Sequence, residues 1–119
     1  MNFDEAITAH SQWKIRLQSV INGTSKETLD PAVVALDNKC VLGQWIYSEA
    51  KQYSDLPEYA ALVKEHAHLH ICAADTLRLA QSGQTEKAKV TLDTGGTFID
   101  ASIRTINAIR HLRKKVEKA

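Results

Sequence analysis

Residues 57–81 read PEYAALVKEHAHLHICAADTLRLAQ, and apolar side chains recur in this stretch every three to four positions. Pro57 suits the first turn of a helix, Ser54 and Asp55 are capping candidates before it, and Gly83 lies where a helix commonly stops. The spacing therefore predicts a helix from Pro57 to about Gln81. Its inward stripe consists of Tyr59, Leu62, Val63, His66, Leu69, His70, Ala73 and Leu77.

The chain before this helix has one regular amphipathic stretch and one irregular stretch. Residues 4–21 predict a helix that ends at Asn22-Gly23, a typical left-handed cap. A short helix is expected to begin at Pro31, and a further segment covers residues 40–50. The inward residues are Ile7, His10, Trp13, Leu17, Val20 and Ile21 in the first helix, and Leu42, Trp45 and Ile46 in the last segment.

The chain after residue 81 predicts one more helix, over residues 85–116, with Thr85 and Glu86 in its first turn. Gly95-Gly96 interrupts it, and because each glycine costs about 1 kcal/mol in a helix, we expect a kink or short break there. Its inward stripe is Val90, Phe98, Ile99, Ile103, Ile106, Ile109, Leu112 and Val116, and the basic residues near its end, Arg110, Arg113, Lys114, Lys115 and Lys118, complement the helix dipole.

Amphipathic helices joined by short polar loops cannot bury their stripes singly. The sequence therefore predicts an all-α protein, an antiparallel four-helix bundle with an additional short helix or segment around residues 30–50. No repeat or linker divides the chain, so residues 1–119 are expected to form a single domain.

Composition narrows the class of protein. The 119 residues are 44% hydrophobic and 24% charged with a net charge of +1, which favours neither nucleic acid nor an anionic membrane as a partner. The first residues do not resemble a signal peptide, and no apolar run approaches the length of a membrane helix. Together with only two cysteines, these features predict a cytoplasmic protein.

Three histidines fall within residues 66–70. His66 and His70 are four positions apart, so both face the apolar stripe and can reach one ion, whereas His68 points nearly the opposite way and is expected at the surface. His10 and Cys40 also lie at inward positions on other segments. Buried imidazoles need a partner, because each costs a few kcal/mol when left unsatisfied.

Three imidazole nitrogens and one thiolate form a four-coordinate set that suits Zn²⁺. The alternative is that these histidines form hydrogen bonds within the core and that Cys40 is a small apolar filler, as Cys72 is expected to be. Spacing alone leaves both interpretations open.

Five neighbours are candidates to support such a site. Trp13 and Trp45 could exclude water, and Gly43 removes a side chain where the segment of Cys40 would approach another helix. Asp37 and Glu65 are candidates to accept the second N–H of a ligand histidine, although capping and solvation explain them as well.

The stretch Cys40-Val-Leu-Gly-Gln-Trp45-Ile-Tyr47, preceded by His10-Ser-Gln-Trp13 and followed by His66-x-x-Leu-His70, resembles the chemoreceptor zinc-binding (CZB) domain family over nearly the whole chain. The resemblance implies a four-helix bundle that binds one zinc ion through His10, Cys40, His66 and His70. It also implies a bacterial sensor, often a homodimer, that regulates a chemoreceptor or diguanylate cyclase output in response to zinc or to oxidants such as hypochlorous acid.

Residues 1–119 contain no such output domain, so we expect the chain to be either a stand-alone member or the sensor module of a larger protein. The two competing hypotheses are a hemerythrin-like di-iron oxygen carrier and a metal-free helical interaction module. A di-iron centre needs several carboxylates beside its histidines, and only the outward Glu65 and His68 form such a pair. A closed zinc site and the lack of catalytic motifs predict that the protein is not an enzyme.

Overall fold

The computed structural model describes residues 2–117, and every regular element in that range is helical. The predicted all-α class is therefore confirmed. The elements are α1 (Phe3–Ile21), α2 (Pro31–Val34), α3 (Val41–Ile46), the 3-10 helix η1 (Glu49–Tyr53), α4 (Pro57–Gln81), α5 (Thr85–Leu92) and α6 (Thr97–Val116).

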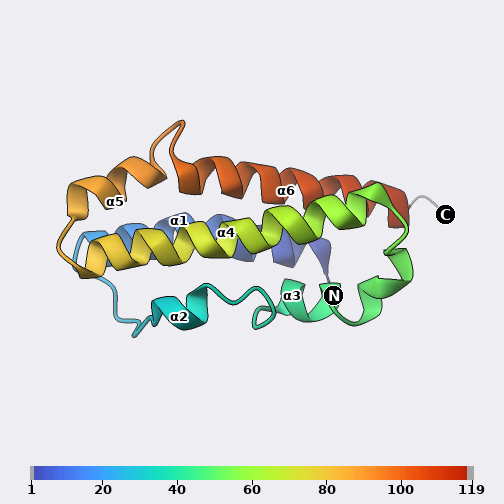
Figure 1. The fold of residues 1–119 in the computed structure, drawn as a ribbon, viewed down its shortest axis with the longest axis horizontal. Helices are drawn as coiled ribbons and strands as arrows, with labels where there is room; N and C mark the ends of the chain where they lie inside the picture. Colours follow the sequence, from blue (N-terminus) through green and yellow to red (C-terminus); the bar gives the residue numbers. More distant parts are fainter. Residues whose placement is uncertain (1, 118–119) are drawn as a thin grey trace.

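Three long helices, α1, α4 and α6, pack against one another (Figure 1). In Figure 1, α1 and α4 run in the same direction, and α5 and α6 run back the opposite way. The segment between α1 and α4, which carries α2, α3 and η1, returns along the molecule, and its α2 contacts α4. Across residues 2–117, no helix combines the length and the apolar character needed to cross a membrane.

Most predicted helix ends are where the sequence placed them. α1 and α4 end at Ile21 and Gln81, and each is followed by a glycine in the left-handed region, Gly23 with φ +74° and Gly83 with φ +82°. The prediction that Ser54 or Asp55 caps the N-terminus of α4 is wrong. Leu56 occupies the cap position without a side-chain hydrogen bond, because the proline that follows it supplies a helical φ and has no N–H to satisfy.

Two predicted segments are divided. Residues 40–50 form α3, which ends at Ile46, and then η1, which begins at Glu49. The break predicted at Gly95-Gly96 is confirmed between Leu92 and Thr97. Glycine is required at both positions, because Gly95 has φ +83° and a Cβ on Gly96 would lie 2.3 Å from the carbonyl oxygen of Val90.

The prediction that Val90 and Ile103 face inward is wrong, because Val90 is 63% exposed and Ile103 is 54% exposed. The break separates α5 from α6, so Val90 on α5 does not continue the buried face of α6. On α6 itself, Ile103 lies about 140° around the helix from Phe98 and outside the buried face. The buried face of α6 instead includes the small residues Ala101, Thr105 and Ala108, which allow α4 and α6 to approach closely.

The buried apolar residues form two clusters. His10 lies on α1 between a residue of one cluster and a residue of the other, and His66 lies in the same way on α4. Two buried polar rings therefore separate the two apolar clusters. One cluster includes Leu17, Leu69, Leu77 and Phe98, and the other includes Ala6, Leu42, Leu62, Ile109 and Leu112.

Candidate metal centre

Four side chains from three parts of the chain converge in this polar region. His10 comes from α1, Cys40 precedes α3, and His66 and His70 come from α4; one donor atom from each lies within 4.8 Å of the others. The Cys40 Sγ lies 3.3 Å from the Nε2 of His66, 3.7 Å from that of His70 and 3.9 Å from that of His10. The structure therefore brings together all four residues that the sequence singled out.

The three imidazoles are held in their neutral form. Their exposed fractions are 3% for His10, 0% for His66 and 4% for His70. Burial is the largest effect on each ring and lowers its pKa, to about 2 for His66. A neutral imidazole has one unprotonated nitrogen, so each ring can offer a lone pair to a cation.

Two backbone carbonyls determine which nitrogen of their imidazole is unprotonated. The Nδ1–H of His10 donates to the carbonyl of Ala6 at 2.7 Å, and the Nδ1–H of His70 donates to that of Val34 at 2.9 Å. Because a carbonyl oxygen only accepts, both rings carry their proton on Nδ1, and their Nε2 lone pairs face the cluster.

His66 has no comparable partner. Its Nδ1 is buried without a hydrogen bond, and its Nε2 lies 3.0 Å from the Nε2 of His70. The Nε2 atoms of the three rings and the Sγ of Cys40 nevertheless face one point. A cation at that point would accept a lone pair from each of them, so the arrangement fits a metal ion.

Cys40 supplies the fourth donor from the start of α3. The backbone N–H of Gly43 donates to its Sγ at 3.3 Å. Burial raises the pKa of the thiol, and the neighbouring N–H groups oppose this effect. The sulfur therefore carries its proton near neutral pH until a cation displaces it.

The distances suit zinc. With Zn–S near 2.3 Å and Zn–N near 2.0–2.1 Å, a tetrahedron has S···N edges of about 3.6 Å and N···N edges of about 3.4 Å. The observed S···N distances of 3.3–3.9 Å span the first value, and 3.0 Å between His66 and His70 is close to the second. The cluster contains no carboxylate, which argues against a di-iron centre.

The two carboxylates proposed to orient a histidine do not do so. The carboxylate of Asp37 accepts a hydrogen bond from the Tyr47 hydroxyl at 2.5 Å. At Glu65 the backbone carbonyl, not the side chain, accepts one from Thr105 at 2.9 Å. The orienting groups are the backbone carbonyls described above, and the sequence has no signal for them because every residue has a carbonyl.

Gly43 is required for a different reason from the one predicted. A Cβ at this position would lie 1.8 Å from the carbonyl oxygen of Asp37. The close approach is therefore to the loop that precedes Cys40, not to another helix. This contact folds the loop against the first turn of α3, where the sulfur is held.

The two tryptophans differ in their relation to the site. The Trp13 ring meets His70 edge-on, with 6.5 Å between ring centres. Trp45 packs instead against Phe3, at 5.3 Å, and Tyr53, at 6.4 Å, so it belongs to an apolar cluster next to the site.

The residues set aside from the site are placed as predicted. His68 is exposed, and Cys72 is buried among apolar residues of the core. The sulfur of Cys72 lies 3.5 Å from the Nε2 of His68. Neither residue belongs to the cluster of four donors.

These features define a class: helical proteins in which three histidines and one cysteine converge in the interior and could hold a metal ion. Residues 10–77, more than half of the chain, match the model of the chemoreceptor zinc-binding domain family. The chain belongs to this family. The matched span contains all four converging residues, while α5 and α6 lie beyond it. No curated protein and no solved structure matches the chain.

Proposed function

We propose that the chain is a zinc-binding sensor or regulatory module in which His10, Cys40, His66 and His70 hold one Zn²⁺. The observation that carries this proposal is the convergence of three Nε2 atoms and one Sγ within 4.8 Å in the protein interior. Four protein ligands close the coordination sphere, and a closed sphere leaves no position for a reacting water. The proposed role is therefore regulatory and not catalytic.

Metal occupancy is the proposed signal. The ligands belong to α1, to α4 and to the start of α3, so a bound ion ties the segment between α1 and α4 to both helices. His70 also holds α2 through the carbonyl of Val34. Structural zinc sites contribute about 10–16 kcal/mol, enough to couple occupancy to the order of this segment. The overall arrangement that we propose is the antiparallel four-helix bundle, with residues 31–53 as its broken second member.

Oxidation of Cys40 is a proposed second input. Cys40 is the one ligand of the four that is only partly buried. Conversion of its thiolate to sulfenic acid would remove a strong donor to zinc and loosen the site. We further propose that the chain acts in the cytoplasm as a homodimer with a signalling partner of the chemoreceptor or diguanylate cyclase type.

The ligand assignment is tested by zinc content and affinity in the parent and in Cys40→Ala and His66→Ala. The matched controls are Cys72→Ala and His68→Ala, which change the same residue types on α4 outside the cluster. We expect one zinc per chain in the parent and the controls, and affinity at least about 100-fold weaker in the two ligand variants. Tight stoichiometric binding in both ligand variants would show the assignment to be wrong.

The oxidant input is tested by titrating hypochlorous acid into the zinc-loaded protein while following zinc release and the oxidation state of each cysteine. We expect Cys40 to be oxidised before Cys72, with zinc released in step. If Cys40 stays reduced and zinc stays bound at near-stoichiometric doses, oxidation is not an input.

A further inference from the structure

A groove of about 210 Å³ opens beside the metal centre and reaches two of its ligands, Cys40 and His70. Its apolar walls come from α1 and from the segment that carries α2. Apart from the two ligands, the ionisable residues that line it are Arg16 and Lys39, and both are cationic. Trp13 and Val34 are among its apolar lining residues.

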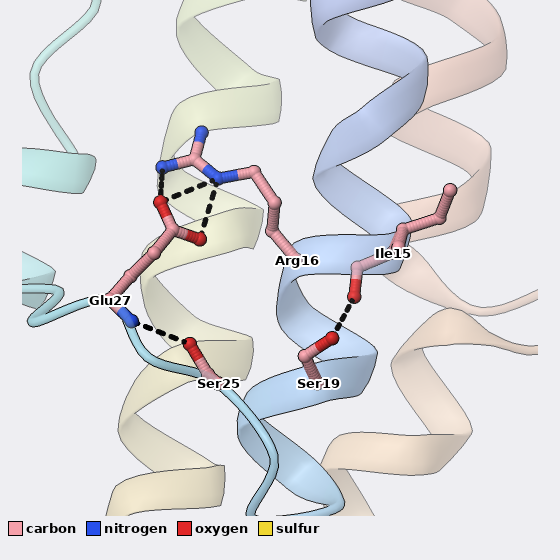
Figure 2. A network of polar contacts seen from close by, with 5 residues as sticks. All are labelled: Ile15, Arg16, Ser19, Ser25 and Glu27. Atoms are coloured by element: carbon pink, nitrogen blue, oxygen red, sulfur yellow. Dashed lines mark hydrogen bonds and ion pairs between the residues drawn. The ribbon is translucent and has the colours of Figure 1, made fainter.

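Figure 2 shows Arg16 extending from α1 to Glu27 on the loop that follows. The Arg16 Nη2 lies 2.7 Å from Oε1 of Glu27, and its Nε lies 3.1 Å from Oε2. The Ser25 hydroxyl accepts the backbone N–H of Glu27 at 3.2 Å and so helps to position the carboxylate. The hydrogen bonds from Arg16 lower the pKa of Glu27, so the carboxylate is ionised and neutralises Arg16.

Arg16 also contacts the wall next to the metal centre. Its guanidinium carbon lies 3.9 Å from the centre of the Trp13 ring, the same ring that meets His70. The ion pair therefore joins the loop to α1 at the groove. Lys39 is different, because it forms no ion pair with any residue in the range 2–117.

A second cavity, of about 350 Å³, also reaches Cys40. Apart from the ligands His10 and Cys40, its one ionisable lining residue is Glu5. Cys40 thus lines two openings of opposite charge, and a charged solute should use them unequally.

We infer that the groove beside Trp13 is the entrance by which small anions reach Cys40 and its metal, with Lys39 attracting them and the Arg16–Glu27 ion pair acting as the gate. The significance of this route rests on the proposed function, because a zinc sensor responds to whatever reaches its thiolate and ion. Loss of the Glu27 charge leaves the positive charge of Arg16 uncompensated and loosens the loop. The groove then becomes both more positively charged and wider.

The test compares alkylation of Cys40 by iodoacetate, an anion, and by iodoacetamide, its neutral counterpart. In both reactions the sulfur displaces iodide, and the thiol proton goes to the buffer. Rates are measured by peptide mass spectrometry, with Cys72 in the same molecule as the control thiol. Both rates are proportional to the thiolate fraction of Cys40, so their ratio does not depend on that fraction. The metal-free protein is used, so the result is independent of whether zinc binds.

We expect Lys39→Gln to lower the iodoacetate-to-iodoacetamide ratio at Cys40 by about twofold to fivefold, and Glu27→Gln to raise it by a similar factor. Asp4→Asn, which breaks the Asp4–Arg113 pair elsewhere, should leave the ratio unchanged. Salt at about 0.5 M should shrink both effects through screening. The inference is overturned if Lys39→Gln has no effect, or if Glu5→Gln alone raises the ratio, since the second cavity would then be the route.

Discussion

Replacing His66 by leucine should change stability in opposite directions with and without zinc. In the metal-free protein the variant should be more stable than the parent, because the wild-type ring is fully buried and its Nδ1 has no partner. In the presence of zinc it should be less stable than the parent, because one of four ligands is lost.

The magnitudes follow from the contacts of this ring. Its centre lies 4.5 Å from that of His70 and 5.1 Å from that of His10, and leucine of similar size would replace one of three crowded imidazoles. Removing the unsatisfied nitrogen is worth about 1–3 kcal/mol, before any packing loss. The parent gains about 4 kcal/mol from zinc at 1,000 times its Kd, and the variant should lose most of that gain.

The assay is urea unfolding of the parent and of His66→Leu, each in a chelator and in excess zinc. His68→Leu is the matched control, since His68 lies two residues away on the exposed side of α4 and should keep the full response to zinc. The expectation is wrong if the variant keeps the zinc-dependent stabilisation of the parent, or if the metal-free variant is clearly less stable than the metal-free parent.

Gly43→Ala should destabilise the protein by about 1–3 kcal/mol and weaken zinc binding, because the new Cβ meets the carbonyl of Asp37; urea unfolding and zinc titration measure this. Zinc binding at pH 7.5 should release about one proton, from the Cys40 thiol, because burial keeps the histidines neutral. Calorimetry in buffers of different ionisation enthalpy should detect one released proton per zinc in the parent and no released proton in Cys40→Ala. The metal-free protein should lose stability as the pH falls from 7.5 to 5. Burial lowers the pKa of His10, His66 and His70 in the folded protein, so near pH 6.5 the unfolded chain binds protons that the folded chain does not. Urea unfolding of His66→Leu at several pH values should show a weaker pH dependence than in the parent.

The sequence predicted the helices well where the signal is local. Spacing of apolar residues and the glycines after Ile21 and Gln81 placed the ends of α1 and α4, because periodicity and left-handed caps depend on residues close in the chain. It failed for Val90 and Ile103. Val90 lies on α5, which the break separates from α6, and Ile103 lies on α6 outside its buried face. A single stripe drawn through residues 85–116 includes neither difference.

The helical class and the four residues that converge were both predicted before the fold was known, because His66 and His70 share an apolar stripe and His10 and Cys40 lie at inward positions of other segments. How these four side chains are held depends on the folded arrangement of the chain. The acceptors for His10 and His70 are the carbonyls of Ala6 and Val34, and the pairing of Arg16 with Glu27 joins residues in different segments. Every residue has a backbone carbonyl, so the sequence does not indicate which carbonyl accepts a hydrogen bond from a histidine. An ion pair between two segments depends on how the chain folds back, so the local sequence does not predict it either.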